Sequence, residues 1–212
     1  ATSGSQDYTA ATILSDNTTL AGNSLTLASG IDGNSKSLNL NFSQTTSLDG
    51  SFANISNLTS DGDVSLNGNF TTLGDQNYKA NARLAGNVIL QGESLLFSSG
   101  VNGTNHNLGL NFSQATALNG TFENIDYLTS GGDVSLHGTI RTIQSQTYNA
   151  NVSLSGDTTL EGSVLSVASG VDGGGKNLDL NFSSTTSLAG VFSNISNLAS
   201  EGNVAVDGTI QT

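Results

Sequence analysis

A period of 70 residues constrains this chain more than any other feature of its sequence. The segments NFSQTTSLDG, NFSQATALNG and NFSSTTSLAG begin at residues 41, 111 and 181. Three copies follow one another without insertion or deletion, at residues 1–70, 71–140 and 141–210. A long unbroken period is typical of repeat proteins whose units stack, so we expect residues 1–212 to form one solenoid domain.

Local patterns predict that the stacked units are β-strands. Leu38, Leu40 and Phe42 alternate with Asn39 and Asn41, the period of two that places one set inside and the other in water. Pairs such as Asp-Gly and Ser-Gly separate these segments and are typical of turns. The chain has 26 Gly, which disfavours helices. The expected fold class is therefore all-β, a parallel β-solenoid.

A shorter unit, Leu or Val followed by any residue and then Gly, predicts the number of turns. Its occurrences are separated by 28, 18 and 24 residues in each copy, a mean of about 23, which predicts three rungs per copy and nine in all. At about 4.8 Å per rung the rod would be about 43 Å long. The occurrences begin at Leu20, Leu48, Leu66, Leu90, Leu118, Leu136, Leu160, Leu188 and Val206.

Comparison of the three copies separates fixed positions from variable ones. The positions that should face the core are nearly fixed, whereas outward positions change: Asp49, for example, becomes Asn119 and Ala189. This contrast indicates a scaffold. The inward-reading apolar positions that repeat identically are Leu14, Leu20, Leu38, Leu40, Phe42, Leu48, Phe52, Ile55 and Leu58.

One segment in each copy is expected to protrude as a loop between two alternating strands. The segments are residues 29–36, 99–106 and 169–176, and we expect them to form a ridge with a spacing of about 14 Å. Solenoids usually bind through loops on one face, although these segments could also be plain lengthened turns. The candidate ligand contacts are Asp32, Asn34, Lys36, Asn102, Asn105, His106, Asp172 and Lys176.

Charge and composition exclude several classes of function. The net charge is −12 with five Lys and Arg, so neither a nucleic-acid surface nor adhesion to anionic lipid is expected. No run of 18 apolar residues is present, so membrane insertion is not expected. The chain has no Cys, and its two His have no paired partner, so we expect neither a metal nor another cofactor.

The sequence also shows little sign of a catalytic site. Asp61 and Asp63 are the closest approach to a carboxylate pair, but the pair is not kept in the other copies, and acids around a Gly are typical of turns. We therefore expect no enzyme. The tyrosines of the repeated Gln-x-Tyr segment could stack on sugars or, more often for such residues, pack over a strand; they are Tyr8, Tyr78 and Tyr148.

Eleven Asn-x-Ser/Thr triplets occur, a number that chance can supply in a chain so rich in Asn, Ser and Thr. Asn41, Asn111 and Asn181 should point outward by the alternation, so they could accept a sugar. The eleven are at Asn17, Asn41, Asn54, Asn57, Asn69, Asn102, Asn111, Asn119, Asn151, Asn181 and Asn194.

The run QTYNANVSLSGDTTLEGSVLSVASGVDGGGKNLDLNFSSTTSLAG resembles the repeats of filamentous haemagglutinin-like exoproteins. The shared features are the Gln-x-Tyr-Asn opening, Thr-Thr-Leu before a Gly, and the Gly-Val-Asp-Gly turn before an alternating Leu strand. The resemblance covers essentially the whole chain. It implies a right-handed parallel β-helix that forms the shaft of a giant bacterial surface adhesin.

The same resemblance implies a location and partners. Such exoproteins leave the cell by two-partner secretion, through an outer-membrane transporter that reads a secretion domain with Asn-Pro motifs, or as autotransporter passengers. This chain has no Pro, so we expect it to be an interior segment. Family members attach to host receptors, to other bacteria or to biofilm polysaccharide, and contribute to virulence.

Three functions are therefore considered, in decreasing order of expectation. The first is a structural shaft that projects a distal adhesive domain from the cell surface. The alternative is direct low-affinity binding of glycans by the stacked loops, where many sites along the rod compensate for weak individual ones. A polysaccharide-active enzyme is the third and least favoured.

Overall fold

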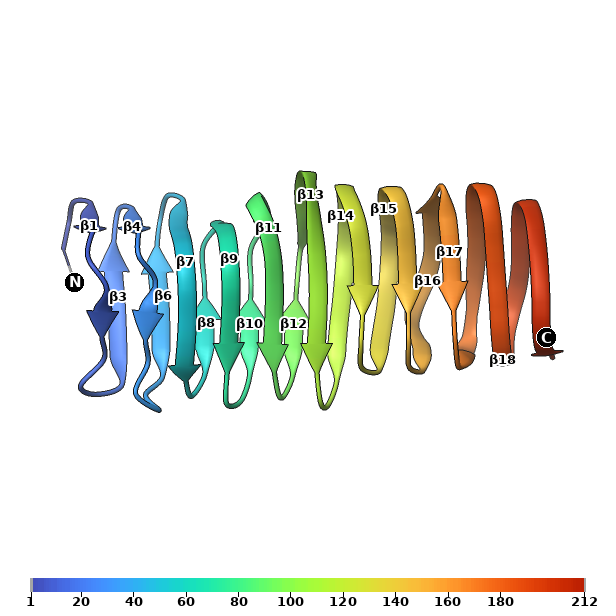
Figure 1. The fold of residues 1–212 in the computed structure, drawn as a ribbon, viewed down its shortest axis with the longest axis horizontal. Coiled ribbons are helices and arrows are strands. Elements are labelled where there is room, and N and C mark those ends of the chain that lie inside the picture. The colour runs from blue at the N-terminus through green and yellow to red at the C-terminus, as the bar shows by residue number, and fades with distance from the viewer. Residues whose placement is uncertain (1, 212) are drawn as a thin grey trace.

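The computed structural model describes residues 2–211 as a single straight rod built of β-strands wound around one axis (Figure 1). The described residues include no helix long and apolar enough to cross a membrane. The strands are β1 (Gln6–Tyr8), β2 (Thr12–Ile13), β3 (Thr18–Gly22), β4 (Leu25–Leu27), β5 (Ile31–Asp32), β6 (Leu38–Phe42), β7 (Thr46–Ile55), β8 (Leu58–Ser60), β9 (Val64–Thr72), β10 (Gln76–Tyr78), β11 (Ala82–Gly92), β12 (Leu95–Phe97), β13 (Gly100–Phe112), β14 (Thr116–Ser130), β15 (Val134–Tyr148), β16 (Val152–Gly162), β17 (Val164–Val167) and β18 (Gly170–Ile210).

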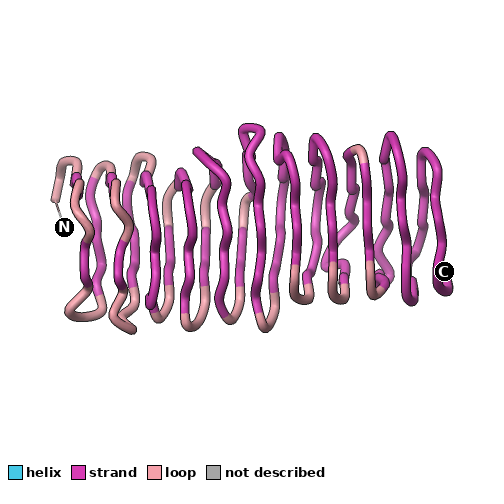
Figure 2. Tube along the Cα trace, in the orientation of Figure 1, coloured by secondary structure: helices cyan, strands magenta, loops and turns pink. Residues whose placement is uncertain are grey.

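Every strand pairing is parallel, and each joins a strand to one a full turn along the chain. In the first two turns, β1, β2 and β3 pair with β4, β5 and β6, so one turn contains three strands and has three sides. Farther along, strands continue around the corners, and β18 alone runs for 41 residues (Figure 2). The prediction of a parallel β-helix is therefore confirmed.

Inward-facing residues stack directly above one another in three columns, one for each side of the turn. Alternation fills these columns with apolar side chains because their neighbours in sequence face water. Column 1 contains Tyr8, Leu27, Leu48, Leu66 and Leu84. Column 2 contains Leu20, Leu40, Ser60, Tyr78, Phe97, Leu118, Leu136 and Leu154. Column 3 contains Ile31, Phe52, Phe70, Leu90, Leu110, Ser130, Tyr148, Val167 and Leu188.

These columns correct the predicted number of turns per copy. The chain takes eleven one-side steps from Tyr8 in column 1 to Tyr78 in column 2, through Thr12, Leu20, Leu27, Ile31, Leu40, Leu48, Phe52, Ser60, Leu66 and Phe70. Eleven steps on a three-sided turn are three and two-thirds turns, not three. Eleven further steps bring Tyr148 into column 3. Equivalent residues of successive copies therefore lie on three different sides of the rod.

The prediction of three rungs per copy was wrong because the Leu-x-Gly unit does not mark every turn. Gly50 and Gly68 do stack, and a Cβ on Gly68 would lie 2.2 Å from the carbonyl oxygen of Gly50. Another turn lacks this Gly. There Phe42 follows Leu40 by two residues, at the position where the unit would have Gly, and it pairs with Gly22 of the preceding turn. Turns are therefore as short as the 18 residues from Leu48 to Leu66.

The core is continuous along the rod. All nine of these fixed apolar positions face inward, and eight of the nine are buried in the first copy; Leu20, near the rod's end, is partly buried. Aromatic rings extend the stacking: the centroids of Phe52 and Phe70 are 4.6 Å apart, and those of Tyr78 and Phe97 are 4.9 Å apart. Such pairs add about 0.5–1.5 kcal/mol beyond burial. Each turn is thus stabilised by the turns on both sides.

Candidate functional site

The three predicted loops are built as tight turns whose polar groups are already used. The Asp32 carboxylate accepts hydrogen bonds from the Asn34 backbone N–H at 3.0 Å and from the Asn54 side-chain amide, one turn along, at 3.1 Å. Asn34 and Ser35 have positive φ, a conformation that Asn tolerates better than most residues. Asp32 therefore holds the loop to the neighbouring turn.

The same arrangement recurs in the other two copies. Asn102 accepts the N–H of Thr104 at 3.0 Å, and its own amide donates to Glu123 at 3.3 Å. Asp172 accepts the N–H of Gly174 at 3.1 Å and the amide of Asn194 at 3.0 Å. The loops are tight bends with internal bonding, and in the second and third copies they are continuous with β13 and β18.

The electrostatics of these carboxylates follow from their bonding. The backbone N–H of Asn34, and then the Asn54 amide, hold the pKa of Asp32 below its ordinary value. The Asn194 amide, and then the Gly174 N–H, do the same for the pKa of Asp172. Both carboxylates are therefore charged and engaged at neutral pH.

The predicted ridge of three loops does not exist, because the loops lie on three different corners. The first lies above Leu14, whose N–H donates to the Asp32 carbonyl. The second lies above Leu84 in column 1, since the Thr104 hydroxyl donates to the Leu84 carbonyl. In the third loop, a Cβ on Gly174 would lie 3.3 Å from the carbonyl oxygen of Leu154, in column 2.

The remaining candidate residues do not converge either. Asn34 and Asn105 are exposed at the loop tips, both with positive φ. Lys36, His106 and Lys176 occupy one equivalent position and are half-buried, each on its own corner. Among residues 2–211, no three His, Cys, Asp or Glu side chains gather where they could hold a metal ion.

The carboxylate pair of the first copy is taken up by separate structural contacts. Asp61 forms an ion pair with Lys79 at 2.7 Å, and both side chains are largely exposed. Asp63 accepts the backbone N–H of Asn81 at 3.1 Å, one turn along. The two acids therefore link turns, and neither is aimed at a shared reaction centre.

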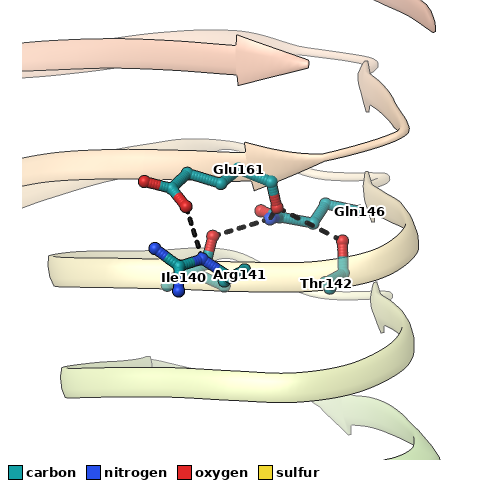
Figure 3. Close-up of polar contacts among 5 residues, drawn as sticks. All are labelled: Ile140, Arg141, Thr142, Gln146 and Glu161. Atoms are coloured by element: carbon teal, nitrogen blue, oxygen red, sulfur yellow. Dashed lines mark hydrogen bonds and ion pairs between the residues drawn. The ribbon is translucent and has the colours of Figure 1, made fainter. Parts of the chain in front are cut away.

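The Gln-x-Tyr segment forms a buried polar link that the sequence analysis did not foresee. The Gln146 amide donates to the carbonyls of Ile140 at 2.8 Å and of Glu161 at 2.9 Å, in the next turn (Figure 3). The Tyr148 hydroxyl donates to the Gln146 side-chain oxygen at 3.0 Å. Gln76 and Tyr78 repeat the link, and burial raises the pKa of both phenols.

This link decides between the two interpretations of the tyrosines. Tyr78 and Tyr148 have at most 1% of their surface exposed, so neither ring can stack on a sugar. Tyr8, in the first turn, is only partly buried. The Gln that precedes each Tyr by two residues was visible in all three copies, and that identity was the signal for a structural role.

One groove on the rod recurs at equivalent places in two copies. Its volume is about 440 Å³ in the first copy and about 300 Å³ in the second. An apolar floor is flanked by a carboxylate, an amide and a hydroxyl. The shared lining is Asp63, Val64, Ser65 and Asn81 in the first copy, and Asp133, Val134, Ser135 and Asn151 in the second.

The two grooves differ at their rims. The first carries Arg83 and Asn102, and the second carries Ser153 and Asp172 at the same places. Asn102 and Asp172 were candidate ligand contacts, so the structure joins them to a groove on the neighbouring turns. The carboxylate of each groove is partly used, since Asp133 accepts the Asn151 N–H at 3.0 Å.

Comparison of the chain with protein-family models, with curated proteins and with solved structures finds no match. The fold therefore stands on the structure itself, and any function must be argued from the residues.

Proposed function

We propose that this chain is a shaft segment of a large secreted bacterial surface adhesin, in which it holds a distal adhesive domain away from the cell. The observation that carries this proposal is the placement of equivalent surfaces on three different sides. A rod whose copies turn their matching surfaces away from one another has no common binding face. Nearly all the apolar inward positions are shared by the copies, and they serve stacking.

The variability of the outward positions supports the same role. Asp49 lies at an exposed corner, and its equivalents are Asn119 and Ala189. Substitutions at such places leave the columns intact, so the rod can change its surface and keep its shape. A net charge of −12 suits a long particle that must stay dispersed outside the cell.

The test is an in-phase deletion in the full-length protein. Removal of residues 71–140 joins the first copy to the third with the columns continuous, and attachment of the cells should persist with a shorter rod. The matched control removes residues 71–120, which breaks the columns and should abolish display of the distal domain. Loss of attachment in the in-phase variant, with the protein still displayed, would contradict the proposal.

A second function, weak glycan binding by the segment itself, is favoured only by the recurring groove. A groove of this size with a carboxylate, an amide and a hydroxyl over an apolar floor offers contacts to one or two sugar rings. The isolated chain would be tested on a glycan array together with Ser65→Trp and Ser135→Trp, which fill the two grooves. Thr59→Trp, on a strand outside both grooves, is the control. Silence of the unsubstituted chain across the array would remove this second function.

A further inference from the structure

The Asn-Phe-Ser triplet is the one Asn-x-Ser/Thr triplet present in all three copies. It occupies residues 41–43, 111–113 and 181–183. The positions that follow it have changed: Gln44 becomes Ser184, and Thr45 becomes Ala115. The triplet has therefore kept its three residues while its outward neighbours drifted.

The fold explains the middle residue of the triplet and leaves the asparagine unexplained, while the Ser43 hydroxyl donates to the Asn23 side chain at 3.3 Å in the first copy. Phe42, Phe112 and Phe182 are buried in the core. Asn41 and Asn111 are exposed and Asn181 is half-buried, each on the outward side of a strand. Asn is depleted in strands because its side chain competes for backbone hydrogen bonds, so neither burial nor strand propensity accounts for it.

Hydrogen bonding does not account for these asparagines either. Across residues 2–211, the side chains of Asn41, Asn111 and Asn181 make no hydrogen bond in the structure. Other exposed asparagines are engaged: Asn54 donates to Asp32 at 3.1 Å, and Asn67 donates to Asp49 at 2.8 Å. The amides of the repeated triplet are therefore not held by a hydrogen bond within residues 2–211.

We propose that Asn41, Asn111 and Asn181 are N-glycosylation sites. Asn41 and Asn111 are exposed and Asn181 is half-buried, and each has an exposed serine two residues along, which completes the acceptor triplet for N-linked sugars. The equivalent sites are three and two-thirds turns apart, about 18 Å along the axis, and each lies on a different side. Sugars at the three sites would therefore not crowd one another.

The transfer requires a separate glycosyltransferase and a sugar activated as a glycosyl phosphate or diphosphate. A C–N bond forms between the asparagine Nδ2 and the anomeric carbon of the donor. The bond from that carbon to the phosphate oxygen breaks, and the phosphate or diphosphate leaves with the bonding electron pair. The amide loses one proton to a base of the transferase, and no oxidation or reduction takes place.

The test uses the protein purified from the cells that make it, digested and mapped by mass spectrometry. Peptides that contain Asn41, Asn111 and Asn181 should carry mass increments of whole sugars. The internal control is the triplet at Asn102, whose amide donates to Glu123 at 3.3 Å, and its peptide should be bare. Bare peptides at all three sites, or equal modification of Asn102, would overturn the proposal.

Substitution of the serine separates glycosylation from other modifications of the amide. Ser43→Ala keeps Asn41 but removes the acceptor triplet, so the sugar on Asn41 should be lost while those on Asn111 and Asn181 remain. Ser43→Thr should keep the sugar on Asn41. Ser43 is exposed, so neither change should prevent folding. A sugar that survives Ser43→Ala would also overturn the proposal.

Discussion

Removal of one 70-residue copy should shorten the rod by three and two-thirds turns and turn everything beyond the deletion by a third of a revolution. Residues Thr45 and Thr185 occupy equivalent exposed positions in the first and third copies. In the intact chain they are seven and one-third turns apart, about 35 Å along the axis. Deletion of residues 71–140 should bring them to three and two-thirds turns, about 18 Å along the axis.

The chain has no Cys, so Thr45→Cys and Thr185→Cys would carry the only two nitroxide labels. Pulsed electron double resonance then measures the distance between them in the intact and the shortened chain. The labels are one side of the rod apart in both forms, so the change in distance reports the axial rise alone. A distance near 29 Å in the intact chain, the value for six turns with copies directly stacked, would refute the offset of the copies.

Three further predictions concern the free energy of unfolding, measured by urea denaturation. For each variant the dependence of this free energy on urea concentration is compared with that of the unsubstituted chain before the unfolding midpoints are converted to free energies. The buried Thr116 hydroxyl has no hydrogen-bond partner among the described residues, so Thr116→Val should stabilise the protein by about 1 kcal/mol. Thr72→Val should instead destabilise it by about 1 kcal/mol, because that hydroxyl donates to a backbone carbonyl at 2.8 Å; equal effects of the two changes would contradict the argument. A Cβ on Gly33 would lie 2.5 Å from a backbone Cα, so Gly33→Ala should cost about 1–3 kcal/mol. Gly4→Ala, with no atom within 4 Å, should change stability by less than about 0.5 kcal/mol. Because the pKa of Asp32 is lowered by folding, its contribution is complete above the ordinary carboxyl pKa and is lost as the pH falls through the folded value. Asp32→Asn should therefore reduce the loss of stability between neutral and acidic pH, and an unchanged pH profile would count against the contact.

Much of the fold could be predicted because alternation is a local property of the chain. Leu38, Leu40 and Phe42 identify an inward face without reference to any other segment, and all three are buried. The self-comparison of the copies then separates inward from outward positions along the whole rod. Tyr127, which stands where the other copies have Asn57 and Asn197, is 46% exposed.

The number of turns per copy could not be predicted in the same way, because it depends on which segments stack. Leu40 pairs with Ser60 in column 2, a pairing that breaks any search for a purely apolar ladder. The Leu-x-Gly unit skips such turns, so it undercounts them. The error in the loop positions followed from the same undercount, since a ridge requires a whole number of turns per copy.

The buried polar link was missed for a related reason. Gln is usually a surface residue. Gln76 can be buried because its side-chain amide donates to the carbonyls of Phe70, in its own turn, and Gln91, in the next. Only its identity in the three copies pointed inward. The recurring groove was also out of reach, because it is formed between turns.

The fraction of a turn left over by each copy has a consequence for how such a chain can change through recombination. Gain or loss of one copy by unequal exchange would alter the length of the rod and also turn everything beyond it by a third of a revolution. Gain or loss of three copies, eleven whole turns, would alter the length alone. Natural variants that differ in copy number would therefore point a distal domain in one of three directions around the rod axis. Selection for one direction would favour variants that gain or lose three copies at a time.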